Sequence, residues 1–358
     1  MNPIATAARR QTTIAVLLLS AIGGALVGID LAARNERLRE VFDQPREEIS
    51  RRTKTTFSHT GYFVDFEDRL LLDELPVADY SQGGVYLIGS SNLKWATVFW
   101  RLPKEQQAVI HNYGIGASND TAQAQFLRHL VERDGLLSAG GNKNLVILGT
   151  SYHHLAHDVL PGGFFVSLWE RHGLFTYDPT DGIQPVKMSD FVRFLIIERV
   201  RVTSFLAAWK NRMLTKFSEQ RWGAPELRVR QHDRQAYCVR RFEFMGKAWR
   251  AKMQDQIRTF SRTIDYLRRN DAHVAVVLLP HGSWEDSLPF QRIYRDKLVE
   301  LCRMKEVSLH DWSDLLEDEA FADSIHVNLS GMEALQEKFM EIALPHLHKS
   351  GALPQFDD

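Results

Sequence analysis

The chain has 358 residues, with 44 Lys and Arg against 45 Asp and Glu, and 44% of its residues are hydrophobic. This composition is ordinary for a globular protein, and it excludes a disordered chain, a collagen-like repeat and a polytopic membrane protein. Two cysteines exclude a disulfide scaffold and a cysteine-rich zinc module. The near-zero net charge conceals a split: residues 187–270 hold 20 Lys and Arg against eight Asp and Glu, a net charge of +12, and the remainder holds 24 against 37, or −13.

The N-terminal segment predicts a membrane anchor. Gln11–Ile29 is uncharged over 19 residues, which is close to the minimum for a helix that spans a bilayer. An arginine pair precedes it and Asp30 follows it, so the positive-inside rule places the N-terminus in the cytoplasm and the rest outside. A cleaved signal peptide, ending near the alanines at 32 and 33, is the alternative. A buried soluble helix is disfavoured because the stretch is apolar on every face.

The densely charged segment Asn35–Lys54 indicates a juxtamembrane helix or stalk. In this interpretation the chain has six parts: a cytoplasmic tip and transmembrane anchor (1–34), a stalk and lead-in (35–80), the first half of a core (81–154), a basic and mostly helical insertion (155–270), the second half of the core (271–348) and a tail (349–358).

Short apolar runs bounded by turn residues predict five buried strands: Val85–Ile88, Ala108–His111, Leu145–Leu148, His273–Leu279 and Val307–His310. Helical patterns separate or follow them: Asp120–Glu132, Met253–Arg269, Pro289–Lys305 and Gly331–His348. Strands that alternate with helices predict an α/β fold, a three-layer sandwich around a parallel five-stranded sheet. Right-handed crossovers then place an active site at the carboxyl ends of the strands.

The stretch from Leu155 to Asn270 is too long to be an ordinary connection. Its first part, His157–Met188, is rich in Gly, Pro and aromatic residues and indicates an ordered loop. A helix is predicted over Phe191–Lys210, with Ser189 and Asp190 before it as an N-cap. We favour packing of this helix into the core, and the alternative is a helix that lies on a membrane surface or docks on a membrane partner.

Cys238 and Cys302 lie in the segments that would be extracytoplasmic. They could pair there, since that compartment permits disulfides. They could equally be two buried free thiols, and the sequence does not place them within bridging distance.

Two segments carry residues typical of serine hydrolysis. The first predicted strand runs directly into Gly89–Asn92 (GSSN), where a serine would be exposed at the top of the sheet. That signal is weak alone, because Gly and Ser are common in loops. Near the C-terminus, Asp323 and His326 are three residues apart, so the carboxylate can orient the imidazole and leave its other nitrogen to accept a serine proton. The two segments together favour a Ser-His-Asp triad.

With these segments the chain resembles the SGNH, or GDSL-like, hydrolase superfamily. Gly89–Asn92 matches the first block of that family, and the resemblance implies that Ser91 is the nucleophile. Asn112–Ser118 resembles the second block, where the amide of Gly116 would contribute to the oxyanion hole. Asp323–Gly331 matches the last block and would supply the acid Asp323 and the base His326. The resemblance covers about two fifths of the chain and implies a single α/β domain.

The chain departs from the family in the third block. The family has Gly-x-Asn-Asp there, and the Asn donates a second hydrogen bond to the oxyanion, whereas the corresponding segment Gly149–His154 contains no Asn. Ser151, His153 or Asn92 could supply the missing donor. Since loss of one oxyanion donor can cost about 100- to 1000-fold in rate, the departure indicates a changed acyl chemistry, another donor or a weak hydrolase.

A histidine cluster follows the same strand. His153, His154 and His157 have no carboxylate at a zinc-type spacing, and a serine triad needs no metal. We therefore predict no metal and no other cofactor.

An anchor, an SGNH core and a long insertion resemble the proteins that assist O-acylation of teichoic acids and alginate-type polysaccharides. This resemblance implies a single-pass protein of the bacterial inner membrane with a periplasmic catalytic domain, a polysaccharide as acyl acceptor and a multi-spanning O-acyltransferase as partner. The basic insertion could contact headgroups, an acidic polymer or the partner, or it could be a solvated helical surface. A periplasmic deacylase and a catalytically silent scaffold that binds polysaccharide or a membrane partner are the alternatives. A nucleic-acid partner is disfavoured, because the basic stretch has no recognised fold motif and an extracytoplasmic compartment does not suit it.

Overall fold

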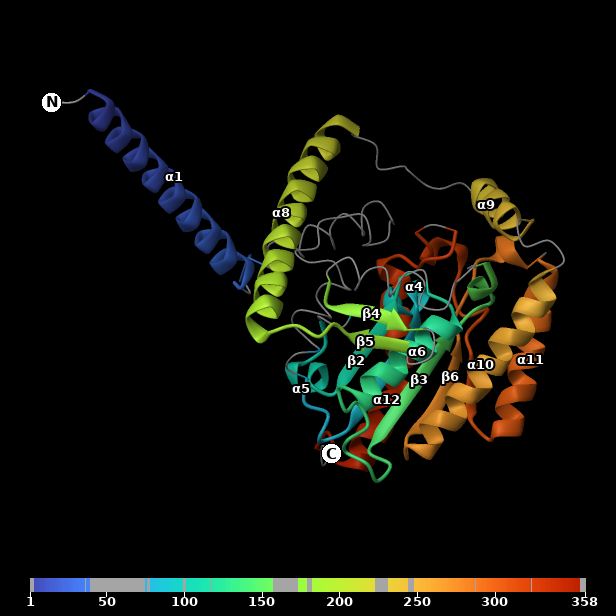
Figure 1. Cartoon of the computed structure of the whole chain (residues 1–358). Helices are drawn as coiled ribbons and strands as arrows, with labels where there is room; N and C mark the ends of the chain where they lie inside the picture. The colour runs from blue at the N-terminus through green and yellow to red at the C-terminus, as the bar shows by residue number, and fades with distance from the viewer. Residues whose placement is uncertain are drawn as a thin grey trace. The chain divides into compact units, whose positions relative to one another are not determined.

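A computed structural model of the chain is shown in Figure 1. It describes residues 3–35, 37–38, 75, 78–98, 101–116, 118–156, 173–178, 182–222, 231–243, 248–286, 288–322 and 324–354. Most of the predicted stalk, most of the predicted loop His157–Met188 and the predicted catalytic Asp323 lie outside these residues. The chain divides into two compact units, of which one holds the helices α1 (Pro3–Ala33) and α8 (Asp190–Trp222) and the other holds the sheet and the remaining elements.

The larger unit is built on a parallel five-stranded sheet with the order β2-β1-β3-β6-β7. Its strands are β1 (Gly84–Ser90), β2 (Ile110–Ile115), β3 (Asn144–Thr150), β6 (His273–Leu278) and β7 (Ser308–Asp311). This is the flavodoxin-like order of a doubly wound fold, and it confirms the predicted α/β class. The second strand was predicted too early. Ala108 caps the short helix α5 (Lys104–Gln107), so the chain becomes extended only at Ile110.

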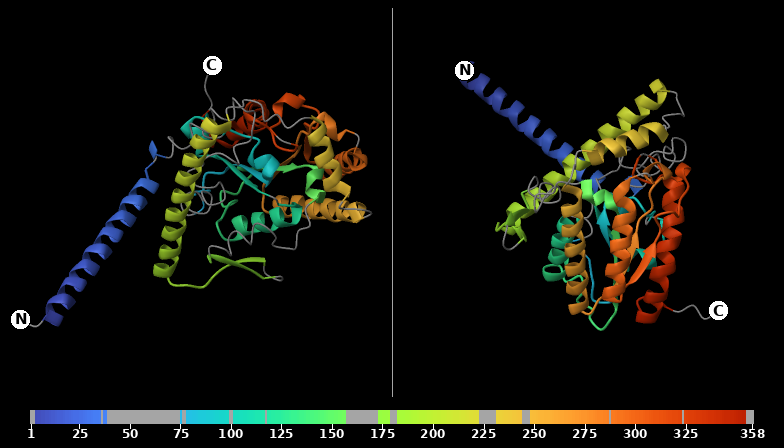
Figure 2. Two further views of the ribbon diagram at one scale, coloured as in Figure 1. Left: turned by 90° about the horizontal axis from the view of Figure 1, so that it is seen from above. Right: turned by 90° about the vertical axis from the view of Figure 1, so that its right-hand side faces the viewer.

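Helices cover both faces of the sheet, as Figure 2 shows. One face carries α6 (Asp120–Glu132), α10 (Trp249–Arg269) and α11 (Pro289–Lys305), and the other carries α12 (Leu329–Ser350). All four helices were predicted. The inserted segment had been expected to include α10, but this helix packs against β6, α6 and α11 and buries Phe260, Ile264 and Leu267. It is one of the helices that build the core.

The central strands are buried on both faces, which explains their continuous apolar sequence. The buried Leu93 side chain packs closely on both Gly89 of β1 and Gly149 of β3. A Cβ atom at Gly89 would meet the Gly149 carbonyl oxygen at 2.7 Å, so this glycine is required for close packing. Gly89 does not have a positive φ, so its role is this close approach and not a left-handed backbone conformation. Close packing at this point draws β1, β3 and the first turn after β1 together.

Further described elements of the larger unit lie between β3 and α10. They are the 3-10 helix η4 (Tyr152–Ala156), the antiparallel hairpin of β4 (Phe175–Asp178) and β5 (Gly182–Pro185), and α9 (Gln231–Glu243). Cys238 on α9 and Cys302 on α11 are both buried free thiols. The two open alternatives for the cysteines are thus decided in favour of free thiols.

The smaller unit contains α1 (Pro3–Ala33) and α8 (Asp190–Trp222). Over Thr12–Ala33, α1 is long and apolar enough to cross a membrane, and the described side chains of this stretch are largely exposed. The predicted helix after Asp190 is present and runs further than expected, to Trp222. Its predicted packing into a core is wrong for most of its apolar side chains: of those described, only Val200 is buried, whereas Phe191 is 68% and Trp209 52% exposed.

Candidate active site

Ser91 and His326 lie together at the carboxyl end of β1. Ser91 is the first residue of the four-residue helix α4 (Ser91–Lys94), directly after the strand. Its Oγ lies 3.0 Å from Nε2 of His326, which is 235 residues away in the sequence. Both side chains are partly buried, so the pair is partly desolvated and can still be reached from solvent. The fold therefore brings together two of the three predicted catalytic residues in hydrogen-bond geometry.

The loop that carries His326 is held at several points. Phe321 and Val327 form an antiparallel bridge, and the Ala322 amide donates to the His326 carbonyl at 2.8 Å. The Asn328 side chain caps α12 by accepting from the Gly331 amide, while the Trp284 indole donates to the Ser324 carbonyl at 3.1 Å. These bonds hold both ends of the turn, so the position of His326 is set by the hydrogen bonds of its neighbours and not only by contacts of its partly exposed side chain. Asp323, the predicted acid, lies in this turn but outside the described residues.

A buried chain of polar side chains ties this loop to the sheet. The side-chain Nδ2 of Asn92 lies 3.3 Å from both the Ile325 carbonyl oxygen and Nδ1 of His153. His153 in turn places Nε2 3.0 Å from Glu285 Oε1, and Glu285 also accepts from the Cys238 thiol at 3.2 Å. Because Nδ2 of Asn92 only donates, Nδ1 of His153 accepts from it and Nε2 carries the proton that faces Glu285. The arrangement ties the loop of His326 to the end of β3 through two hydrogen-bonded steps.

The predicted oxyanion donors take different positions in this chain. The Ser151 hydroxyl lies 3.2 Å from Nδ1 of His153, which the Asn92 side chain also contacts, and of these three residues Asn92 reaches the loop of His326, at the Ile325 carbonyl. Gly116 follows Ile115, whose register partner on β1 is Ser90, and this places Gly116 at the sheet edge beside Ser91. The oxyanion role of these four residues stays a prediction.

A buried Ser-His-Asp array lies next to the Ser91–His326 pair. Ser90 Oγ is 2.8 Å from Nε2 of His154, and Nδ1 of His154 is 2.8 Å from Asp120 Oδ1. All three side chains are buried: Ser90 is 1%, His154 0% and Asp120 3% exposed. A substrate cannot reach Ser90 in this arrangement, so the array is a structural link between β1, the start of α6 and η4. The Ser90 hydroxyl also accepts from the backbone N–H of Asn92 at 3.4 Å and so caps α4.

His153 and His154 are neighbours in the sequence but their side chains bond to different carboxylates, Glu285 and Asp120. Within the part of the chain that the structure describes, which does not include His157, no group of three or more His, Cys, Asp or Glu is placed to hold a metal ion.

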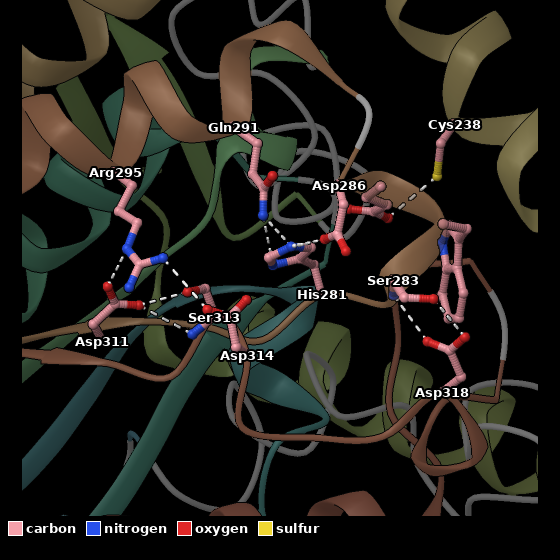
Figure 3. Close-up of polar contacts among 12 residues, drawn as sticks. Cys238, His281, Ser283, Asp286, Gln291, Arg295, Asp311, Ser313, Asp314 and Asp318 are labelled. Atoms are coloured by element: carbon pink, nitrogen blue, oxygen red, sulfur yellow. Dashed lines mark hydrogen bonds and ion pairs between the residues drawn. The ribbon is translucent and has the colours of Figure 1, made fainter.

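A separate polar cluster lies at the carboxyl ends of β6 and β7 (Figure 3). His281 contacts Asp286 at 3.2 Å and also meets the Gln291 amide, while Arg295 pairs with Asp311. Burial lowers the pKa of His281 below its usual range, although Asp286 acts in the opposite direction. The His281 side chain links the segment after β6 to Asp286 and to Gln291 near the start of α11.

No family model and no curated protein matches the chain. Solved structures with a similar arrangement include a provisionally named acylhydrolase from Bacteroides fragilis, with 10% identity and a TM-score of 0.41. That match covers 79% of this chain and 97% of the other. Another is the YxiM protein of Bacillus subtilis, with 11% identity and a TM-score of 0.34, where the match covers 75% of this chain and 57% of the other. Likeness at this level carries no functional argument, so the function rests on the geometry of Ser91 and His326.

Several residues of the site were not predicted. Asp120 and Glu285 are the carboxylate partners of the two adjacent histidines, and Ser90 was taken only as part of the turn before Ser91. A signal for one array was present, since Ser90, Asp120 and His154 each follow or end a strand at the carboxyl edge of the sheet. No sequence pattern indicates Glu285, which is 132 residues from His153.

Proposed function

We propose that the chain is a membrane-anchored serine esterase or O-acyltransferase that works through an acyl-enzyme on Ser91. The observation that carries this proposal is the 3.0 Å contact between Ser91 Oγ and His326 Nε2 at the carboxyl end of β1. A partly exposed serine hydroxyl that donates to an imidazole is the arrangement an activated nucleophile requires. The buried Ser90 array has the same atoms but no access, so it supports Ser91 as the reacting serine.

The chemistry follows from this pair. Ser91 Oγ attacks the acyl carbonyl of an ester while His326 Nε2 takes the hydroxyl proton. Collapse of the tetrahedral intermediate breaks the bond to the leaving alcohol, which receives that proton from His326. An acceptor hydroxyl then loses its proton to His326 and attacks the acyl-enzyme, which releases Ser91. A sugar hydroxyl as acceptor gives transfer, and water gives hydrolysis.

We infer that the acceptor is a polysaccharide and that α1 anchors the enzyme with its catalytic unit on the extracytoplasmic side. The apolar span Thr12–Ala33 supports the anchor, and the arginine pair before it supports the orientation. The polysaccharide and a multi-spanning O-acyltransferase partner are supported by the resemblance to polymer O-acylation proteins. Hydrolytic deacylation by the same pair is the competing outcome.

A fluorophosphonate probe tests the proposed nucleophile, because it phosphonylates an activated serine and marks the peptide that carries it. The full-length protein in detergent should be labelled on Ser91, and Ser91→Ala should abolish labelling. Ser90→Ala is the matched control: it removes the neighbouring hydroxyl, which also faces a histidine, and the folded protein should still be labelled. Labelling that survives in Ser91→Ala, or that maps to Ser90, would overturn the proposal.

The acceptor is tested separately with an acetyl-ester donor. Wild-type protein incubated with the donor and polysaccharide fragments should give acetylated sugar in addition to free acetate, and neither should form with His326→Ala. Release of acetate with no transfer to any sugar would decide for the deacylase.

A further inference from the structure

The smaller unit presents an apolar surface on α8 that its contacts with α1 leave uncovered. Near the base of α1, Ala33 packs on Val200, and partly buried Ile196, Ile197 and Phe205 surround this contact. Arg34 also forms an ion pair of 2.6 Å with Glu198. These contacts bind α8 to the end of the membrane-crossing stretch.

Five apolar residues form what we call the α8 apolar face: Phe191, Leu195, Val202, Leu206 and Trp209. At about 100° per residue they fall within an arc of about 60° on the helix. Four of them are exposed, and the fifth, Val202, is partly exposed. A contiguous exposed surface of large apolar side chains indicates a site of contact with a membrane or with another protein.

The charge of α8 and its contacts with the end of α1 favour a membrane as the contacting surface. Asp190–Trp222 carries seven Lys and Arg against three Asp and Glu, and Arg193, Arg199 and Lys210 are exposed. Each basic side chain near an anionic membrane surface contributes about 1 kcal/mol to association. Because the end of α1 must lie where the chain leaves the bilayer, the contacts of Ala33 and Arg34 hold α8 at the level of the lipid headgroups.

We propose that α8 lies in the headgroup region of the same bilayer that α1 crosses, with the α8 apolar face inserted among the acyl chains. The inference goes beyond the esterase chemistry, since it concerns a second membrane contact. It gives the chain two attachments, a spanning helix and a helix on the surface, so the enzyme would work close to the bilayer.

Site-directed fluorescence on the full-length protein in phosphatidylcholine–phosphatidylglycerol vesicles tests this. Leu195→Cys carries the dye on the α8 apolar face, and Arg193→Cys carries it about 160° away at nearly the same height. Both positions are exposed, and the native cysteines are buried, so unsubstituted protein gives the labelling background. Leu18→Cys, in the exposed apolar surface of α1, reports separately whether the anchor has inserted.

The expected result is quenching of the Leu195 dye by doxyl-labelled lipid with loss of iodide quenching, and the reverse for the Arg193 dye. If the Leu18 dye is quenched by lipid while the Leu195 dye stays open to iodide, the anchor stands and the α8 proposal fails, which would leave the face for a protein partner. A Leu195 dye that is protected from both quenchers would also overturn it, because the face would then be covered by protein.

Discussion

Adjacent serines at the end of β1 face two different histidines, and this makes a sharp test of the site. Ser90 Oγ lies 2.8 Å from Nε2 of buried His154, and Ser91 Oγ lies 3.0 Å from Nε2 of partly exposed His326. Substituting either serine by Ala removes the same Oγ atom, but from two positions that we expect to have different roles. We predict that Ser90→Ala lowers stability and keeps the nucleophile, whereas Ser91→Ala keeps stability and removes the nucleophile.

The magnitude follows from burial. In Ser90→Ala, Nε2 of His154 loses its partner in a site where the imidazole is 0% exposed, and an unsatisfied buried polar group costs about 1–3 kcal/mol. Loss of the cap of α4 adds little, because that helix has only four residues. A loss of about 2 kcal/mol is a factor of about 30 in the unfolding equilibrium constant, and it should lower the thermal midpoint by about 4–8 °C. Ser91→Ala should stay within about 0.5 kcal/mol of the parent.

The assay is thermal unfolding of the two full-length variants in detergent, followed by circular dichroism, beside fluorophosphonate labelling of the folded protein. Equal loss of stability in the two variants would refute the assignment of Ser90 to a buried structural array. A larger loss in Ser91→Ala would refute it also, since solvent would then replace the Ser90 hydroxyl more readily than the Ser91 hydroxyl.

Three further substitutions test the described contacts. Because burial lowers the pKa of His281, the unfolded chain takes up its proton first as the pH falls below about 6.5; stability should drop from pH 7 towards 5, and an equally steep drop in His281→Gln would contradict this. Burial raises the pKa of Asp134 to about 6, so ionisation costs stability as the pH rises from about 4 to 6. Urea unfolding should show Asp134→Asn more stable than the parent at pH 8, by at most about 3 kcal/mol, and unchanged at pH 3; an equal gain at both pH values would refute it. Gly89→Ala should cost about 1–3 kcal/mol in the same assay because its Cβ meets the Gly149 carbonyl, whereas Gly24→Ala, with open space around it, should unfold like the parent.

Local periodicity was sufficient to predict the sheet and its covering helices. The apolar runs at β1 and β3 are buried on both faces, and α6 and α11 have the predicted bounds, because apolar burial is encoded by neighbouring residues. The start of β2 was missed because Ala108 is apolar and follows a helical turn, so composition alone does not separate a cap from a strand.

The candidate site was predictable where one short segment carries the chemistry, as for Ser91 and for His326. The supporting groups were not, because they come from distant elements that only the sheet order brings together: Glu285 reaches His153 across 132 positions and Asp120 reaches His154 across 34. A histidine beside a histidine gives no indication of which carboxylate each will meet.

The basic segment shows why a composition average can join unlike parts. Of its net charge of +12, α10 contributes +4, with six Lys and Arg against two Asp and Glu, and α8 contributes +4, with seven against three; the other +4 lies outside these two helices. On α10 one side is buried against the core, so its cations form the solvated surface of a packed helix. On α8 the apolar face is exposed, so its cations border a surface that water does not favour. The same sequence pattern is typical of an apolar helix face in a protein core and of one at a lipid surface, because both environments remove the face from water. Only the burial of the helix in the folded chain distinguishes the two cases.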